Sequence, residues 1–261
     1  MRFIFFISLF LFVFSSSALS NNYYQTRGYK LDPLITNKPF DININAELGA
    51  LVTTGNNEST SILSKITVEH DIQQWKLKYS FGSLFKENQK VDSETGKKVT
   101  ETTSEKYSVN GEAKFEMDQR RSLFSYASGD FDRFGSYKTY FSWVAGYSFR
   151  AIDGSLIVWD IDIAPGFTHV EPKDEESESA PMLRSSSNFE WTVSSHAKLN
   201  QKFSIETSSI NTRMIFDTSL TAKIHGSALM KVSYKAIHDD SVAVNKEKTN
   251  TQTSVTLVIN F

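Results

Sequence analysis

The last eleven residues of the chain, 251–261, alternate between polar and apolar side chains. One face of this segment carries Val255, Leu257, Ile259 and Phe261, and the other face is mainly polar. Side chains that alternate with a period of two point to opposite faces of a β-strand. A strand that ends a chain on phenylalanine is typical of the barrels of bacterial outer membranes. We therefore expect this segment to be the closing strand of such a barrel.

The same period of two recurs along residues 41–261, and no helical period persists there. Alternating segments about ten residues apart, separated by turn-forming residues, are typical of an all-β barrel or sandwich. We expect twelve strands, at residues 41–54, 59–71, 73–85, 104–118, 121–133, 138–151, 154–168, 186–199, 202–210, 214–225, 227–238 and 250–261.

The connections between the expected strands alternate in kind. Every second connection is a tight turn, at residues 71–73, 118–120, 152–154, 200–202 and 225–227. The others are polar; three are long, at 87–104, 171–185 and 239–250, and three are short, at 55–58, 134–137 and 211–213. Tight turns on one side and long loops on the other are typical of outer-membrane barrels. The pattern predicts an antiparallel up-and-down transmembrane β-barrel of twelve strands, with both ends on the tight-turn side.

One face of the expected strands contains no aspartate, glutamate, lysine or arginine. An arginine or lysine that faces lipid near the membrane midplane costs about 2–4 kcal/mol, whereas the outer faces of a soluble sandwich lie in water. The face carries side chains such as Ile42, Leu48, Ile66, Trp75, Phe81, Val109, Trp143, Phe149, Ile163, Trp191, Phe203, Leu220 and Val232. In the fifth strand two phases compete, Leu123/Ala127/Phe131 and Phe124/Tyr126, and the sequence leaves both open.

The opposite face is charged, with equal numbers of acids and bases. Its candidates for lining the barrel lumen are Glu47, Lys65, Glu69, Lys76, Lys78, Lys106, Glu112, Lys114, Glu116, Asp160, Asp162, Glu190, Lys198, Glu206, Asp217, Lys223, Lys231 and Lys235. Rings of charge select ions in a pore, but buried charges must be paired, and equal numbers favour pairing. Barrels of about 8 strands are filled by side chains and those of about 16–18 are open. A narrow channel and a packed interior therefore both remain.

The beginning of the chain has the pattern of an export signal. Arg2 is followed by an apolar run at residues 4–14 that is broken once, and small polar residues come next. The run is too short to cross about 30 Å of hydrocarbon. We expect a cleavable signal peptide at 1–20, an extended periplasmic arm at 21–40, and a location in the outer membrane of a Gram-negative bacterium.

Composition excludes several classes of function. The chain has no cysteine, so neither disulfides nor thiolate metal sites can form. Its formal charge is −2, which argues against a nucleic-acid partner. The mean hydropathy of −0.32 is that of a soluble protein, but alternating barrel strands average to similar values.

Two histidines are candidates for a hydrolase site. His196 is expected on an inward-facing strand position beside Ser194, and His238 on a polar loop. A triad needs a base within reach of a nucleophile and a third, orienting group, and serine is abundant enough here to supply such neighbours by chance. The acidic segment 171–178 is suited either to binding calcium or magnesium or to plain solvation. No two histidines have metal-ligand spacing, so we expect no metal site. We also expect no cofactor and no enzymatic activity.

Several short segments are similar to one family. They are Gly49-Ala50-Leu51-Val52-Thr53-Thr54-Gly55-Asn56, Asp132-Arg133-Phe134, Gly146-Tyr147-Ser148-Phe149-Arg150, Lys231-Val232-Ser233-Tyr234 and Thr253-Ser254-Val255-Thr256-Leu257. These segments resemble domain-of-unknown-function family 481, whose members are often called salt-induced outer membrane proteins. The resemblance spans residues 41–261, departs at 171–185, where an insertion is expected, and implies an outer-membrane barrel without an established activity.

The resemblance carries over no catalytic residue. It implies that Val255, Leu257, Ile259 and Phe261 lie where the barrel assembly machinery reads them as a signal. The further expected partners are outer-membrane lipid and lipopolysaccharide, and the barrel is expected to be a monomer. The function that follows is a small passive channel or an envelope structural protein. The alternatives are a barrel-embedded hydrolase of lipids or peptides and a soluble periplasmic β-sandwich that binds a ligand.

Overall fold

The computed structural model describes residues 41–260, apart from 54–57, 92–97, 136, 174–175 and 243–246. Within these residues, no helix is long and apolar enough to cross a membrane. The strands are β1 (Asp41–Thr53), β2 (Glu58–Ile72), β3 (Trp75–Val91), β4 (Lys98–Glu116), β5 (Arg121–Asp132), β6 (Tyr137–Asp153), β7 (Ile157–Pro172), β8 (Glu178–Ser194), β9 (Ala197–Ser208), β10 (Thr212–His225), β11 (Ala228–Asp239) and β12 (Thr249–Asn260). The expected signal peptide and arm lie outside the described residues.

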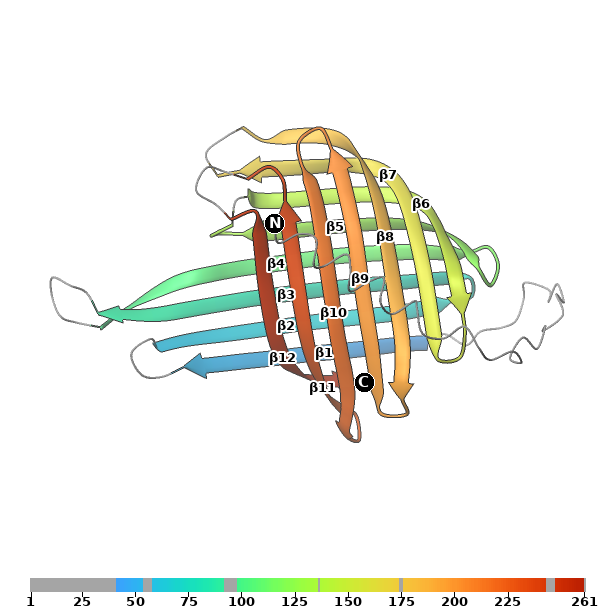
Figure 1. Cartoon of the computed structure of the whole chain (residues 1–261), viewed down its shortest axis with the longest axis horizontal. Coiled ribbons are helices and arrows are strands. Elements are labelled where there is room, and N and C mark those ends of the chain that lie inside the picture. Colours follow the sequence, from blue (N-terminus) through green and yellow to red (C-terminus); the bar gives the residue numbers. More distant parts are fainter. Residues whose placement is uncertain are drawn as a thin grey trace, which may run out of the picture. The chain divides into compact units, whose positions relative to one another are not determined.

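The twelve strands form one closed antiparallel barrel. Each strand is hydrogen-bonded to its neighbours in sequence, and β1 also pairs with β12. In Figure 1 the blue and green strands β1–β5 form one wall, and the orange and red strands β9–β12 cross in front of it. The predicted up-and-down barrel is confirmed. A closed barrel has no sheet edge, so the alternative of a two-sheet sandwich is wrong.

The seam that closes the barrel is short. Among the described residues, its register joins Asn45–Leu48 of β1 to Leu257–Asn260 of β12 in four residue pairs, whereas β1 pairs with β2 along its whole length. The side-chain amide of Asn260 donates to Oδ1 of Asn43 at 3.2 Å and to Oδ1 of Asn45 at 3.0 Å. Side-chain amides thus supplement the few backbone hydrogen bonds of this seam.

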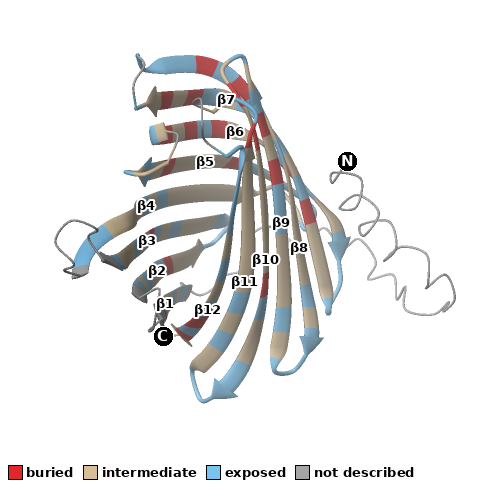
Figure 2. Cartoon of the chain, turned by 60° about the vertical axis from the view of Figure 1, so that its left-hand side comes forward, coloured by how far each residue is buried: buried red, intermediate tan, exposed pale blue. Residues whose placement is uncertain are grey.

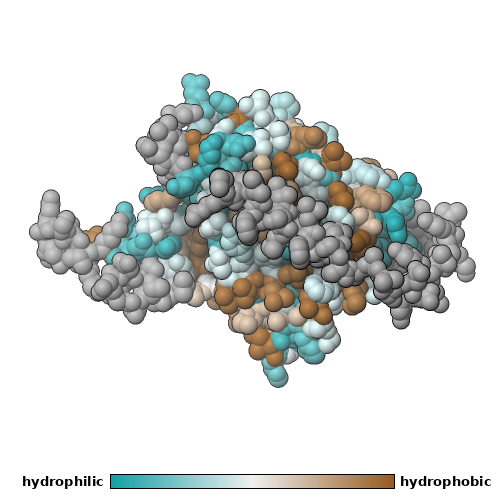
Figure 3. Space-filling model, in the orientation of Figure 1, coloured by the Kyte–Doolittle hydropathy of each residue, from teal (hydrophilic) through white to brown (hydrophobic). Residues whose placement is uncertain are grey.

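The apolar face predicted from the sequence is the outer face of the barrel. Leu48, Ile163 and Val255 are 60%, 53% and 58% exposed, and large apolar side chains of most other strands are exposed in the same way. Figure 3 shows hydrophobic patches on the visible surface, and hydrophilic side chains mainly at its extremities. A band of this kind is unfavourable in water and suits the hydrocarbon of a bilayer, as in transmembrane barrels.

The neighbouring strands decide the phase of β5, which the sequence left open. Leu123 is paired on one side with Phe115 of β4 and on the other with Tyr147 of β6, both of which point outward. Leu123 and Phe131 are accordingly 50% and 45% exposed, whereas Phe124 is 7% exposed and points into the barrel. The choice depends on partners that are distant in sequence.

The boundary between β8 and β9 differs from the prediction. The expected turn at residues 200–202 is wrong, because these residues lie within β9, and the turn is formed by Ser195 and His196. The expected loop at 171–185 is also too long, since its second part belongs to β8. The side chains that face a polar lumen have the composition of a turn, so alternating hydrophobicity does not separate the two.

Two glycines allow β6 and β7 to approach each other closely. A Cβ atom at Gly146 would lie 2.2 Å from the carbonyl oxygen of Ile163, and one at Gly166 would lie 2.0 Å from that of Trp143. Pro165, which has no N–H to donate, lies beside them, and the pairing of β6 with β7 is interrupted there without a change of register. No residue other than glycine fits at these two positions without moving the backbone.

Candidate functional site

The charged face lies opposite the apolar belt and lines the lumen. Its residues are cross-strand neighbours, as Glu47 is of Lys65 and Asp217 is of Lys235. By the same register, the inner positions of their strands are held by Glu69, Lys76, Lys78, Lys106, Glu112, Lys114, Glu116, Asp160, Asp162, Glu190, Lys198, Glu206, Lys223 and Lys231. What these residues do depends on how each is paired.

Apolar side chains fill the part of the lumen that lies against the inner face of β5–β8. Phe124, Val144, Ala164 and Met182 point inward from these four strands and form one buried cluster, against which Tyr126 packs. Val144 and Ala164 are fully buried. Figure 2 shows bands of buried residues on β5, β6 and β7. This side of the lumen therefore has the packing of a protein core.

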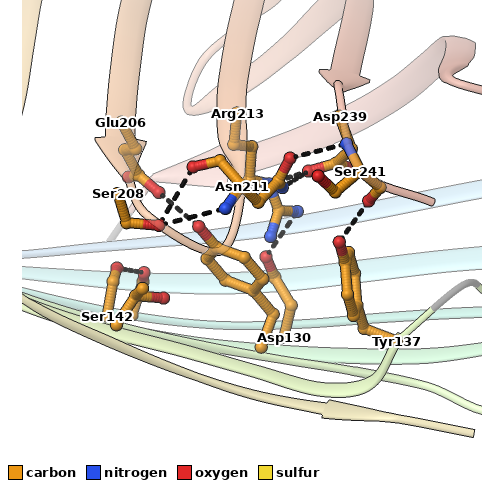
Figure 4. Close-up of polar contacts among 12 residues, drawn as sticks. Asp130, Tyr137, Ser142, Glu206, Ser208, Asn211, Arg213, Asp239 and Ser241 are labelled. Carbon is orange, nitrogen blue, oxygen red and sulfur yellow. Dashed lines mark hydrogen bonds and ion pairs between the residues drawn. The ribbon is translucent and has the colours of Figure 1, made fainter. Parts of the chain in front are cut away.

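Arg213 connects opposite walls of the barrel. We call the end with the β5–β6, β9–β10 and β11–β12 connections the loop end. Near it, the guanidinium of Arg213 on β10 donates to Asp130 Oδ2 on β5 at 3.1 Å and lies 3.8 Å from Asp239 Oδ1 on β11. The Tyr140 ring of β6 is 4.1 Å from its guanidinium carbon. Since β5 and β10 are not adjacent, these contacts cross the lumen (Figure 4).

Glu206 accepts hydrogen bonds from two walls. Arg184 Nη1 on β8 donates to Glu206 Oε1 at 2.6 Å, and the Tyr140 hydroxyl on β6 donates to Oε2 at 3.3 Å. Arg184 also stacks on Tyr126, with 4.4 Å from its guanidinium carbon to the ring centre. Glu206 is only 3% exposed, so these donors replace the water that a buried carboxylate loses. We call Asp130, Tyr140, Arg184, Glu206, Arg213 and Asp239 the loop-end cluster.

The β9–β10 connection is attached to the loop-end cluster. Asn211 Nδ2 donates to Asp239 Oδ1 at 2.7 Å, and Asn211 Oδ1 accepts from the backbone N–H of Ser241 at 3.0 Å. The hydroxyl of Tyr137 donates to the carbonyl oxygen of Ser241 from the β6 side (Figure 4). Hydrogen bonds therefore connect both walls and their connections at this end.

At the opposite end, which carries the tight turns, inner charges pair along the wall. Lys76 lies 2.7 Å from Glu116, and Arg150 lies 2.8 Å from Asp160. Lys114 donates to a serine hydroxyl and lies 4.0 Å from Asp160. A small hollow, with room for about one water molecule, opens beside these side chains and the β4–β5 turn. The inner face of the tight-turn end is therefore charged, with its charges paired along the wall.

Two lysines nearer the tight-turn end, each the fourth residue of its strand, have carboxylate partners. Lys231 Nζ donates to both oxygens of Glu47, each at 3.0 Å. Lys78 Nζ donates to Glu69. These pairs agree with the interpretation of a neutralised lumen.

Three lysines near the middle of their strands differ. Lys65 on β2, Lys202 on β9 and Lys235 on β11 have no carboxylate oxygen within 4.0 Å in the described part of the chain. Asp217 is the cross-strand neighbour of both Lys202 and Lys235, yet it forms no ion pair with either. Lys202 remains exposed although its position faces the lumen. We call Lys65, Lys202 and Lys235 the lumen lysines.

Sequence reasoning missed the two arginines of the loop-end cluster. Arg184 was expected in a long loop and Arg213 in a short connection, because both strands start earlier than predicted. A signal was present in the sequence. Steps of two residues from the inner positions Glu190 and Asp217 toward the start of each strand lead to Arg184 and Arg213.

The histidines lie away from the lumen. His196 is in the β8–β9 turn, exposed, with its Nδ1 2.8 Å from the Ser195 hydroxyl, so the expected inner strand position beside Ser194 is wrong. His238 Nδ1 is 2.8 Å from Thr249 Oγ1. Among the residues described, no three histidine, aspartate or glutamate side chains are grouped to hold a metal ion.

Comparisons with known proteins give a family match. The family model described as "Protein of unknown function, DUF481" matches residues 46–261. The "Uncharacterized protein YdiY" of Escherichia coli (strain K12) is 27% identical over 206 residues, which are 78% of this chain and 75% of that protein. Neither description names an activity.

Solved barrels are similar at low sequence identity. The translocator domain of autotransporter NalP from Neisseria meningitidis has a TM-score of 0.47 at 9% identity, covering 84% of this chain and 87% of that one. The NanC porin has a TM-score of 0.45 at 9% identity, covering 84% and 98%. The COG4313 outer membrane channel from Pseudomonas putida F1 has a TM-score of 0.45 at 10% identity, covering 84% and 94%.

Proposed function

Because this chain belongs to DUF481, a family of proteins of unknown function, we propose its function from its own lumen. The protein is a narrow passive channel for small hydrophilic solutes in the outer membrane. The path runs along the charged inner face between β9–β12 and β1–β4, and the apolar filling beneath β5–β8 makes it narrow.

One observation carries this proposal: Lys202 points into the barrel and is nevertheless exposed. An inner side chain can only be exposed where the lumen leaves space beside it. Lys198, four residues nearer the tight turn on the same strand, is also inner, with 48% of its side chain exposed. The space beside β9 is polar and accommodates water, which is the minimum that a hydrophilic path requires.

The outer face of the barrel supports an outer-membrane location. The apolar belt, the closed topology and the tight turns at one end are the features that a bilayer demands of a barrel, because no water satisfies a backbone group in hydrocarbon. Lipid and lipopolysaccharide would contact the belt, and the assembly machinery would read Val255 and Leu257 at the end of the chain.

Recording from a planar bilayer tests the channel. The full mature chain, refolded in detergent, should insert and give discrete conductance steps that are small compared with those of an open porin measured in the same cell. A sample denatured by boiling before it is added should give none. If the folded barrel inserts and passes no current over a wide voltage range, the protein is not a channel.

The loop-end cluster favours a second candidate, an envelope structural protein. Arg213 and Glu206 are buried and bridge opposite walls, as in a barrel that is filled rather than open. Under this alternative, deletion of the gene would weaken the envelope against detergent without changing solute uptake.

A further inference from the structure

The lumen lysines form a group of positive charges from three strands that are far apart around the barrel. Lys65 is on β2, Lys202 on β9 and Lys235 on β11, and all three lie near the middle of their strands. The charge of Lys65 acts on Lys202, and the charge of Lys235 acts on Lys65, although neither pair lies on adjacent strands. Asp217 on β10 is the cross-strand neighbour of both Lys202 and Lys235, so these two lysines flank one position of the inner face. Lys65 holds an inner position on β2, which is not adjacent to β9 or β11, so its interactions with them cross the lumen.

The carboxylates nearby do not neutralise this group. Glu47 and Glu69 are already paired with Lys231 and Lys78. Asp217 acts on Lys65 and Lys202 from beyond ion-pair distance. The inner face therefore has equal numbers of acids and bases in total, but an excess of positive charge around the lumen lysines.

Glu112 is the other carboxylate whose charge acts on Lys202, and it too forms no ion pair with any residue that the structure describes. Within that part of the chain, the three lysines therefore have two unpaired carboxylates near them, Asp217 and Glu112. An ammonium group in a space of low effective dielectric attracts an anion more strongly than it does in bulk water. The local excess of positive charge lies where the lumen leaves space for a solute.

We propose that the lumen lysines form an anion-binding constriction, so that small carboxylate- or phosphate-bearing solutes are the class that the barrel admits. This inference rests on the proposed channel function. A solute carrying two negative oxygens can contact two of the lysines at once, whereas a cation meets repulsion from all three.

The reversal potential in a potassium chloride gradient tests the proposal. The wild-type barrel should prefer chloride several-fold over potassium. Lys202→Gln should reduce this preference, Lys202→Arg should keep it, and the triple change of Lys65, Lys202 and Lys235 to glutamine should abolish it. Asp217→Asn should increase it, because one counter-charge of the lysines is removed.

A matched control is Lys198→Gln, on the same inner face of β9. Lys198 is paired with Glu190 at 2.7 Å near the tight turns, so its loss should change the preference less than the loss of Lys202. Equal effects at the two positions, or a wild-type channel without preference, would overturn the assignment of selectivity to the lumen lysines.

Conductance and binding separate failure of the two proposals. If the barrel passes no current, the channel function fails, and titration of the folded barrel with inorganic pyrophosphate decides the inference alone. Saturable binding that is lost in the triple variant would support an anion site in a closed barrel. No binding, or equal binding by the triple variant, would contradict the site.

Discussion

Arg213 shows how much one inner residue can determine. It is 6% exposed and holds β5, β6, β10 and β11 through carboxylates and a ring on opposite walls. Removing one partner of a buried ion pair leaves the other charge uncompensated and costs about 3–5 kcal/mol. We expect Arg213→Ala to destabilise the folded barrel by this amount in urea titrations and to raise the conductance of molecules that still fold.

The control for this prediction is Arg133→Ala. Arg133 forms an ion pair with Glu105 at 3.0 Å, but 71% of its side chain is exposed. Exposed pairs contribute about 0–1 kcal/mol, so the free energy of unfolding should change little. Equal losses for the two variants would show that burial of the Arg213 contacts has no bearing on stability.

At the scale of the element, alternation alone was enough to predict twelve strands and the outer face of nearly all of them. The lipid side requires apolar residues, and that requirement leaves a period of two in the sequence. Alternation was insufficient at Asn200, where polar lumen-facing residues have the composition of a turn. It was also insufficient at Leu123 and Phe124, where both faces of the strand are apolar. In β5 the phase depends on pairing with β4 and β6, which the strand's own residues do not specify.

The contacts of the loop-end cluster could not be predicted from the sequence for a related reason. Asp130, Glu206 and Arg213 come together only because the barrel wall folds back on itself between β5 and β10. The spacing of these residues along the sequence does not predict that they are in contact. The inner phase of Glu206 was predicted, but its partners depend on which walls face each other.

The β6–β7 pair supplies the prediction at this scale. A side chain at Gly146 would overlap the backbone of β7, so Gly146→Val should cost about 1–3 kcal/mol or more through displacement of the strand. Gly111 has no atom closer than 4.0 Å to an added Cβ, so Gly111→Ala should be nearly neutral. Urea unfolding in detergent measures both, and a Gly146 variant as stable as the Gly111 variant would contradict the close approach.

At the scale of the whole molecule, closure predicts resistance to denaturant. Every described strand has a hydrogen-bonded neighbour on both sides, so unfolding must break a continuous ring of pairs. We expect the refolded protein to migrate differently on a denaturing gel before and after boiling. Identical migration of the two samples, with the unheated one still folded by circular dichroism, would count against a barrel that resists detergent.

Among the described residues, four residue pairs join β1 to β12, and every other neighbouring pair of strands is joined over a greater length. Separation of β1 from β12 therefore breaks fewer residue pairs than separation of any other two neighbouring strands of the barrel. Backbone groups beyond Leu48 that are not matched across the seam form a partial edge, and such an edge is a template for an incoming strand. Amide protons of β1 and β12 would exchange with solvent before those of the other strands, since local opening begins where pairing is shortest. During folding, β1 and β12 are therefore the strands at which an incompletely closed sheet would contact the barrel assembly machinery.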